Sequence, residues 1–350
     1  MKTIDRYVIR EVLWPMAIGL LIFTLLFAAG ALARLDTTAH HVVAWIATLL
    51  GFCSIAVFLY LIDYAARLLR PVSIVWRVGE EGRAVIESVY PDPAKEPGVS
   101  ANPRGKPPSP DRTVAHHGKP GIVLAVNLKA LVPLAQKADA IIEFLPRVGD
   151  FVGTGEPVFR LYGGARSIDE RRLRGAVAFG PERTIEQDST FAFRIIVDIA
   201  IKALSKAIND PTTAVLAIDQ LQRLLRIVGN RNLRDEEILD ESGQLRVIFR
   251  TPNWEDFVHL TFSEIRLYGA ENFQIARRLR AMIENLAQTL PEYRRPALRN
   301  ELDLLDRTLE KLYTFPEDLA LARVPDPQGL GGASDRQAAM AARLDSPIRR

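Results

Sequence analysis

The chain has 350 residues, enough for about two domains, and its 45 Lys and Arg nearly balance its 42 Asp and Glu. This balance excludes a nucleic-acid-binding protein that relies on basic charge. Five histidines and one cysteine argue against a zinc site and exclude an internal disulfide, so we assign no metal or cofactor. The mean hydropathy of +0.04 is high for a soluble protein, and the apolar excess lies before residue 65.

Two apolar runs near the start predict a transmembrane hairpin. Residues 13–33 and 42–62 carry no charged side chain, and each is about as long as a helix that crosses the bilayer core. We expect the second helix to continue to residue 64. Only RLDTTAHH joins the two runs. Aromatic side chains, which prefer the membrane interface, lie near the ends: Trp14, Trp45, Tyr60 and Tyr64.

A secretory signal is the alternative interpretation of the first run. Lys2, Arg6 and Arg10 would form its basic region, and the ALA that precedes Arg34 resembles a cleavage site. However, the run is longer than an ordinary signal core, and the second run follows at once. We therefore expect an uncleaved anchor.

Basic residues predict the orientation in the membrane. An amphipathic segment, residues 1–12, carries three of them, and four arginines follow the second span between residues 67 and 83. The connecting loop has Arg34 alone. The positive-inside rule then places both termini in the cytoplasm, so that the residues after 64 form a large cytoplasmic region.

The cytoplasmic region is predicted to begin with a helix and a linker. Valines at near-helical spacing favour a juxtamembrane helix over residues 72–90, although Gly79 and Gly82 weaken this prediction. Residues 91–120 are dense in Pro, Gly, Ser and charge, which predicts a flexible linker. The pair His116 and His117 in this linker is interpreted as solvated rather than metal-binding.

Residues 121–165 predict a small β-rich segment. The stretch RVGDFVGTGEPVFRLYG has the turn-strand-turn cadence of a small barrel of the biotinyl or lipoyl type, but it lacks a carrier lysine between the glycines. Gly149, Gly153 and Gly155 can supply positive φ at the turns. A phosphate-binding loop is the weaker alternative, because the strand and helix that such a loop needs are not evident around it.

Residues 182–323 predict a mainly helical cytoplasmic domain. Apolar residues at i, i+3, i+4 and i+7 favour helices over residues 190–208 and 215–228, and later over 254–268, 272–289 and 296–313. DESGQLRVIF predicts a hairpin turn and a strand between them. Residues 324–350 are polar and rich in Pro and Gly, which predicts a disordered tail. The predicted fold class is therefore membrane-anchored α+β: a two-helix transmembrane hairpin, a small barrel-like segment and a mainly helical domain.

A polar corner interrupts the helical pattern in ALSKAINDPTTAV. The Asp210 carboxylate can cap the next helix, and Pro211 suits its first position, which together stabilise the helix start by about 1 kcal/mol. Asn209 can adopt the left-handed conformation that ends the preceding helix. The corner thus has a sufficient structural explanation, and a catalytic or ion site is the alternative.

The corner belongs to a longer stretch, ERTIEQDSTFAFRIIVDIAIKALSKAINDPTTAVLAIDQL, that resembles the signature of the bacterial membrane proteins grouped as domain of unknown function 2254. The resemblance covers about residues 42–320 and includes GDFVGTGEPVFRL and TPNWEDFVHLTFSEIRLYGA. Lys206 stands where the family usually has proline, so this turn is expected to remain helical. The residues of possible functional weight are Glu186, Gln187, Asp188, Asp198, Ser205, Asn209, Asp210, Pro211, Thr213 and Asp219.

The first thirty residues carry a second resemblance. IDRYVIREVLWPMAIGLLIFTLLF is similar to the start of the lipopolysaccharide-export permease pair, where an amphipathic segment precedes the first membrane helix. Nothing later in the chain resembles the other membrane helices or the periplasmic domain of those permeases. A fused or rearranged start is one interpretation.

Three functions compete. The first is a non-enzymatic, homo-oligomeric inner-membrane protein that acts as a scaffold, regulator or pore and has the lipid bilayer as its partner, with no nucleic acid and an unidentified ligand. The second is a hydrolase-type enzyme in which Glu182, Arg183 and the signature carboxylates gather as acids or as ligands of a hard cation. The third is an accessory component of lipid export. We favour the first and assign no catalytic residues, because no nucleophile–base set is evident.

The orientation is testable with reporter fusions after residue 38 and after residue 120. The basic residues predict that the first site is periplasmic and the second cytoplasmic. Compartment-specific reporters, such as alkaline phosphatase and a fluorescent protein, should therefore give opposite results at the two sites. The same compartment at both sites would defeat the hairpin.

Overall fold

The computed structural model describes most of the chain: four two-residue pieces between residues 18 and 30, then 40–68, 70–94, 109–233 and 237–332. The chain divides into two compact units, Met1–Ile74 and Val75–Arg350. Several sequence predictions fall outside the described residues. They are the amphipathic start, most of the first span, residues 95–108 of the linker and the tail from residue 333.

The first unit contains α3 (His40–Leu68), in which the second predicted span lies. Within it, Thr48–Ala65 is long and apolar enough to cross a membrane, with a mean hydropathy of 1.8, and none of its residues is buried. Large apolar side chains such as Trp45 and Phe52 are 76% and 68% exposed. Among the described residues this is the one candidate span, so the two-helix hairpin stays a prediction.

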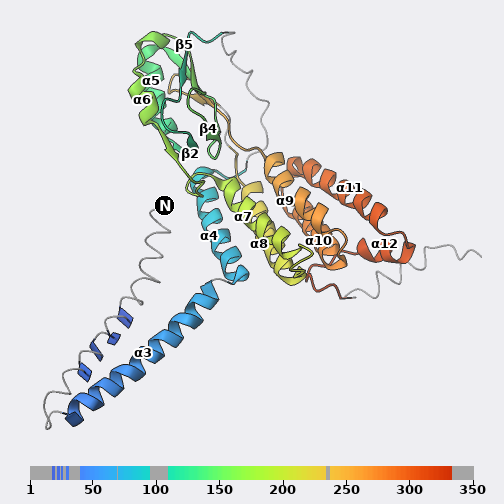
Figure 1. Cartoon of the computed structure of the whole chain (residues 1–350). Helices are drawn as coiled ribbons and strands as arrows, with labels where there is room; N and C mark the ends of the chain where they lie inside the picture. The colour runs from blue at the N-terminus through green and yellow to red at the C-terminus, as the bar shows by residue number, and fades with distance from the viewer. Residues whose placement is uncertain are drawn as a thin grey trace, which may run out of the picture. The chain divides into compact units, whose positions relative to one another are not determined.

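The second unit contains a bundle of helices whose positions largely match the apolar periodicity of the sequence (Figure 1). The expected helices over 254–268, 272–289 and 296–313 are confirmed to within one residue at each end. The bundle consists of α4 (Pro71–Val89, from Val75 on), α7 (Ser189–Ala203), α8 (Pro211–Gly229), α9 (Trp254–Gly269), α10 (Phe273–Thr289), α11 (Arg295–Leu312) and α12 (Pro316–Ala322), with a 3-10 turn at Glu292–Arg294.

The glycines of α4 allow a close helix contact rather than breaking the helix. A Cβ at Gly82 would lie 2.7 Å from the Ala192 Cβ of α7, and one at Gly79 would lie 2.7 Å from the Gln220 Oε1 of α8. Arg223 of α8 also forms an ion pair of 2.5 Å with Glu80. Since position along α4 increases together with position along α8, the two helices run parallel, and α4 is part of the bundle core.

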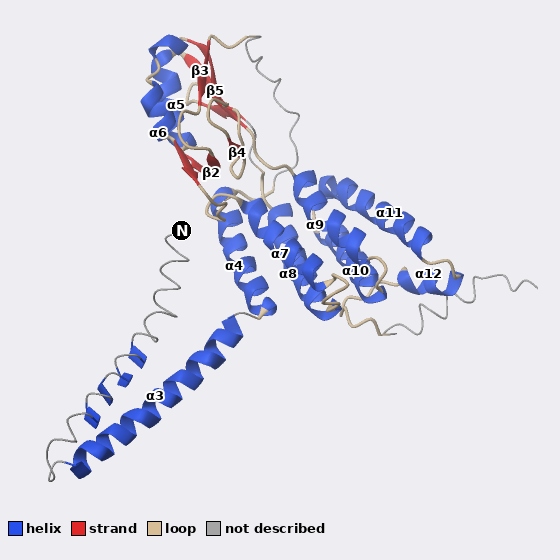
Figure 2. Ribbon diagram, in the orientation of Figure 1, coloured by secondary structure: helices blue, strands red, loops and turns tan. Residues whose placement is uncertain are grey.

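The strands form two open sheets, with the order β1-β5-β3-β8-β7 in one and β4-β2-β6 in the other. Figure 2 shows α5 and α6 against the strands, and their Leu131 and Leu173 enter the same apolar core as Ile142 and Phe159. The elements are β1 (Arg112–Ala115), β2 (Gly121–Val126), α5 (Leu128–Ala138), β3 (Ala140–Phe144), β4 (Phe151–Val152), β5 (Pro157–Gly163), a 3-10 turn (Ala165–Ser167), α6 (Glu170–Gly175), β6 (Val177–Gly180), β7 (Glu237–Leu239) and β8 (Leu245–Phe249).

The barrel predicted over residues 121–165 is therefore wrong for the described strands. The strands of this segment divide between the two sheets, because their edges pair with strands from outside it. β3 pairs in parallel with β8, which arrives about a hundred residues later, with Ile142 opposite Val247. β5 pairs with β1, with Val114 opposite Phe159. Because these strand edges are already paired with other strands, they do not pair with each other to close a barrel.

Part of the predicted linker is folded. Residues 112–115 form β1. Val114 is 2% exposed because it packs in the apolar core of the two sheets and the helices α5 and α6, which together we call the strand part. His116, expected to be solvated, is buried, and its ring lies 4.2 Å from that of Phe179. Its Nε2 is 2.8 Å from the carbonyl oxygen of Lys119. Hydrogen bonding and ring contact thus account for this histidine.

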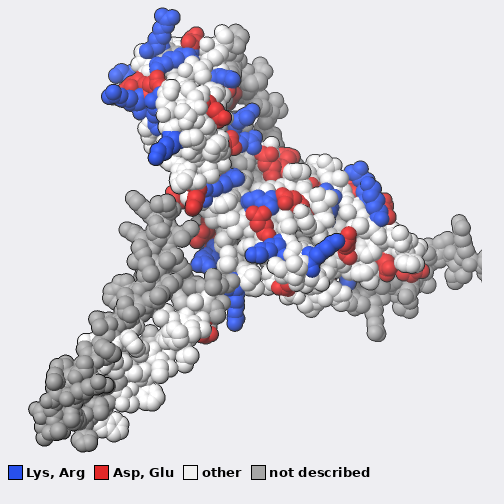
Figure 3. All heavy atoms as spheres, in the orientation of Figure 1, with Lys and Arg blue, Asp and Glu red and all other residues white. Residues whose placement is uncertain are grey.

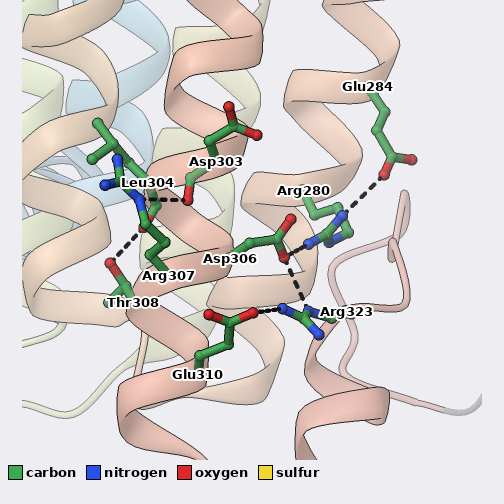
Figure 4. A network of polar contacts seen from close by, with 9 residues as sticks. All are labelled: Arg280, Glu284, Asp303, Leu304, Asp306, Arg307, Thr308, Glu310 and Arg323. Carbon is green, nitrogen blue, oxygen red and sulfur yellow. Dashed lines mark hydrogen bonds and ion pairs between the residues drawn. The ribbon is translucent and has the colours of Figure 1, made fainter.

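Three arginines within about one turn of α10 are buried rather than exposed. Arg277, Arg278 and Arg280 are 1%, 5% and 8% exposed. Arg280 pairs with Asp306 of α11, which also accepts from Arg323 at 3.2 Å (Figure 4). Buried arginines persist when their guanidinium groups are paired and hydrogen-bonded. This network joins α10, α11 and the residue after α12.

The beginning of the predicted disordered tail is packed against α10. The Arg277 guanidinium donates to the carbonyl oxygens of Val324, Gly331 and Gly332 at 2.9, 3.2 and 3.0 Å. Asp326 is 1% exposed and accepts from three backbone N–H groups, those of Gln328, Gly329 and Gly331. Residues 324–332 are therefore held by hydrogen bonds that the composition of the segment does not indicate.

The close α4 contact is testable by adding one methyl group. Gly82→Ala should lower the free energy of unfolding by about 1–3 kcal/mol, because the new Cβ meets the Ala192 Cβ of a packed helix. Gly79→Ala is the matched control, since the atom it meets is the end of a flexible glutamine side chain. The melting temperatures of the two full-length variants in detergent should differ clearly. A Gly82→Ala protein as stable as the control would contradict the contact.

Candidate functional site

The two polar groups of the signature lie at the two ends of the antiparallel pair α7 and α8, whereas Asp198 and Asp219 lie within these helices. Gln187 and Asp188 precede α7, whereas Asn209, Asp210 and Pro211 begin α8. Because α7 has 15 residues, about 22 Å separates the two groups. The signature therefore does not form one site; it begins two helices.

At the first end, Asp188 is a buried helix cap. Its side chain is 3% exposed and accepts from the backbone N–H of Phe191 at 3.1 Å. The same carboxylate accepts from the Thr190 hydroxyl and from the Arg183 guanidinium, both at 2.5 Å. Arg183 thereby compensates the charge of a carboxylate that burial would otherwise penalise.

Two sequence motifs meet at Asp188. Gly149, from GDFVGTGEPVFRL, has a φ of +94°, and a Cβ there would collide with the Asp188 carboxylate and the Arg183 guanidinium. The predicted positive φ is confirmed for Gly149 and Gly155, whereas Gly153 is not in that region of φ. The Gly153 N–H instead donates to Glu156 at 2.9 Å. Glycine at 149 is thus needed both for its conformation and for the close approach of the salt bridge.

Beside Asp188 a pocket of about 500 Å³ opens between the strand part and the bundle. This volume lies in the range of sites for small molecules. Its walls come from six segments: the end of α4, the β2–α5 connection, the end of β3 with the loop after it, the α6–β6 turn, the start of α7 and the exit of β8. The lining includes Tyr90, Lys129, Ala178, Gln187, Asp188, Arg250 and Thr251.

The charge of the pocket favours an acidic ligand over a cation. Lys129 and Arg250 line it and are exposed, while the Asp188 charge is compensated by Arg183. The exposed Gln187 uses its Oε1 to accept from the backbone N–H of Val126 at 3.2 Å, which joins the start of α7 to β2. No nucleophile–base pair among the described residues lines the pocket.

At the second end, the corner has the predicted capping geometry. Asp210 accepts from the Thr213 backbone N–H at 3.1 Å and from the Thr213 hydroxyl at 2.5 Å, and Pro211 occupies the first turn of α8. These bonds, the hydroxyl first, hold the pKa of Asp210 below its usual value. Asn209 has the expected left-handed φ of 46°.

The preceding helix ends earlier than the sequence predicted. α7 stops at Ala203 instead of continuing to residue 208, and Lys206 lies in a turn rather than in helix. The turn closes with the Asp210 N–H donating to the Ala203 carbonyl at 2.8 Å, while the Ser205 hydroxyl donates to that of Lys202. The expectation that replacing the usual proline keeps this turn helical is therefore wrong.

The other signature carboxylates lie apart, and two of them, Asp198 and Asp219, each pair with an arginine. Asp198 is exposed on α7 and pairs with Arg194, which also bonds Glu264 of α9. Asp219 of α8 pairs with Arg278 of α10 at 2.7 Å. Glu186 is exposed. Within the described residues no group of three or more His, Cys, Asp or Glu side chains is placed to hold a metal ion, so the described carboxylates do not gather as ligands of a cation.

The carboxyl group with a raised pKa lies elsewhere. Glu301 of α11 is 5% exposed, and burial raises its pKa although Arg266 lies 3.9 Å away. Perturbed groups in a cleft mark functional sites, but Glu301 does not line the pocket. Sequence reasoning missed the pocket walls from α4 and β8. It included Asp188 among the signature residues but did not assign it as a helix cap, although aspartate just before a periodic apolar run is a helix-start signal.

Comparison with known proteins assigns the chain to a family. Residues 6–285 match the model for predicted membrane proteins of domain of unknown function 2254. The chain belongs to the DUF2254 family. The matched range contains Gly149 and both halves of the signature. It also begins inside the segment that resembles lipopolysaccharide-export permeases, so this start is part of the family match.

The relatives are distant. Uncharacterised proteins of Mycobacterium bovis and Mycobacterium tuberculosis are 25% identical to the chain over 279 residues. The alignment covers 78% of this chain and 53% of each relative, so the chain spans about half the length of the curated relatives it matches. No solved structure matches. The comparisons therefore support a DUF2254 membrane protein and name no activity.

The cap at Asp210 is testable through pH. Asp210→Ala should lower the free energy of unfolding by about 1 kcal/mol at neutral pH, and Asp210→Ser should restore most of this loss, because a hydroxyl can also cap a helix. Since the folded pKa is lowered, the contribution is present above the unfolded pKa of about 3.9 and disappears as pH falls through the folded value. Urea unfolding of the full chain in detergent between pH 7 and pH 3 measures the difference.

The control for this experiment is Asp198→Ala. Asp198 is 59% exposed on the side chain, and an exposed i, i+4 pair contributes about 0.5 kcal/mol or less. A cation-binding or catalytic role of Asp210 predicts another pattern, in which neither alanine nor serine changes stability. That result would remove the capping interpretation.

Proposed function

We propose that this DUF2254 protein is a non-enzymatic membrane-anchored regulator that binds a small acidic ligand in the pocket beside Asp188. One observation supports the proposal above all: the end of α4 lines the pocket, and α4 is the next helix in the chain after α3, which contains the candidate span. Ligand binding and membrane attachment thus involve the same 19-residue helix.

The residue that follows α4, Tyr90, connects this helix to α9 and to the segment that leaves β8. Tyr90, which follows α4, is 1% exposed, packs edge-on against Phe257 of α9 and has its hydroxyl 3.3 Å from that of Thr251. Thr251 belongs to the segment that leaves β8 and also lines the pocket. A ligand that contacts Tyr90 and Thr251 therefore contacts the helix and the strand part together.

The proposal includes the cellular setting that the basic residues predict. Residues 75–350 lie on the cytoplasmic side of the bacterial inner membrane, and both termini are cytoplasmic. The family description of a predicted membrane protein and the candidate span support membrane attachment.

An oligomeric scaffold or pore is the second candidate. It is supported by α3, whose apolar side chains are unburied along Thr48–Ala65, because one such helix cannot enclose a pathway and needs lipid or other helices around it. The mass of the particle purified in detergent distinguishes the two. A multimer supports the scaffold or pore, and a single protomer supports the regulator.

A ligand screen on the full chain in detergent tests the pocket. We expect at least one compound in a panel of small carboxylates and phosphates to raise the melting temperature, since a ligand at 100 times its Kd stabilises by about 2.7 kcal/mol. Ala178→Trp, which places an indole at the wall of the pocket, should abolish the shift. Ala84→Trp is the matched control on an exposed position of α4 outside the lining.

Two results would contradict the proposal. One is a panel without any shift, and the other is a shift of equal size in Ala178→Trp and wild type. Equal melting temperatures of the two unliganded tryptophan variants would verify that the substitution at 178 leaves the fold intact.

A further inference from the structure

Large apolar side chains are exposed at one end of the helical bundle. Ile208 of the α7–α8 corner is 49% exposed, Leu267 and Tyr268 in the last turn of α9 are 67% and 58% exposed, and Leu312 and Phe315 around the end of α11 are 39% and 66% exposed. We call these five residues the corner-end surface.

Contacts between the elements show that these residues share one end. A Cβ at Gly269, at the end of α9, would lie 3.0 Å from Leu204 at the end of α7. Tyr313, which follows α11, donates its hydroxyl to the carbonyl oxygens of Ala270 and Glu271 at 3.2 and 3.0 Å. The end of α9 is therefore next to the end of α7 and next to the end of α11.

The strand part lies at the other end of the bundle and exposes fewer large apolar side chains. Among its described residues, Phe151 and Leu239 are the exposed large apolar side chains. Among the described residues after Val75, the remaining exposed large apolar side chains belong to segments that reach the corner end. They are Trp76, Leu321 and Leu330. Clustered exposed apolar side chains mark an interaction surface, whereas scattered ones do not.

The chain itself holds the corner end close to the candidate span. α4 runs parallel to α8, with Gly79 beside Gln220, so the beginning of α4 lies at the end of the bundle where α8 begins. From Ala65, the last residue of the span, to Val75 the path follows α3 to Leu68 and α4 from Pro71. Helical rise and full extension between limit this path to about 20 Å, whatever the angle between the helices.

The opposite end of the bundle is farther away. α8 has 19 residues and is about 28 Å long, so the strand part begins beyond that distance from the corner end. The corner end is thus the apolar surface that the covalent connection keeps nearest to the bilayer.

We infer that the corner-end surface rests in the headgroup region of the bilayer that α3 enters. Ile208, Leu267 and Phe315 insert apolar side chains, and Tyr268 places its ring at the interface, where amphipathic aromatic side chains are favoured. The inference does not depend on a ligand in the pocket.

The charges around the surface indicate which lipids it needs. Lys202, Lys206 and Lys311 are exposed at this end, and so are Glu271 and Glu317. Figure 3 shows charges of both signs interspersed over the visible face of the bundle. Because the signs are mixed, apolar insertion rather than attraction to anionic lipid is the main contribution. The surface should therefore meet a neutral phosphatidylcholine bilayer.

Lipid-borne quenchers test this inference in the full chain. Cys53 is first replaced by serine, and single cysteines labelled with bimane are placed at Ile208, Tyr268 or Phe315, in nanodiscs that each hold one copy. Phosphatidylcholine with a doxyl group near its headgroup should quench these labels at least twofold more than a label at Phe151. Phe151 is the control because it is 67% exposed in the strand part.

Three outcomes would overturn the inference. They are equal quenching at Phe151 and at the corner end, no quenching at any position, and quenching that requires anionic lipid. A surface covered by a second copy would instead protect the labels from aqueous iodide only in multi-copy particles, without a response to doxyl lipid. Circular dichroism melting of each labelled variant verifies that it is folded.

Discussion

The contact between α4 and the pair α7 and α8 is the constraint on which the rest of the second unit depends. At Gly82 the helices approach so closely that even one methyl group would meet Ala192. Ile86, one turn later, is fully buried, and Tyr90, directly after the helix, packs edge-on against Phe257. A helix held in this way is part of the core, so the segment that leaves the candidate span cannot change position without disturbing the packing of the bundle.

Features set by local sequence were predictable. The 3.6-residue period located α9, α10 and α11, because each has one apolar stripe that must be buried. The Asn-Asp-Pro corner was also predictable from local sequence, because a helix cap needs only a carboxylate, a proline and the N–H groups of the next turn. Gly149 was recognised as a residue of positive φ, although its contact with Asp188 was not.

Features that depend on distant partners were not predictable. β3 pairs with β8, and β1 pairs with β5, so neither sheet could be inferred from residues 121–165 alone. Arg277 looks like part of a polar helix face, but it is buried because the carbonyl groups of residues 324–332 surround its guanidinium. The pocket has walls from six separate segments, and a single sequence carries no signal that brings them together.

The two halves of the signature have a common structural role, because each caps one helix of the pair α7 and α8. Asp188 begins α7 at the pocket, and Asp210 begins α8 at the corner end, so each half stabilises one end of the same helix pair. α4 lies along that pair, with its last residues at the pocket wall and its beginning at the corner end. Packed helices move as rigid bodies rather than stretch, and coupling between the two ends therefore requires a displacement of α4 against α7 and α8. Gly79 and Gly82 lie at this contact, where an added Cβ would already meet Gln220 or Ala192. Any displacement of α4 would therefore have to disturb the same close contact that holds α4 in the bundle.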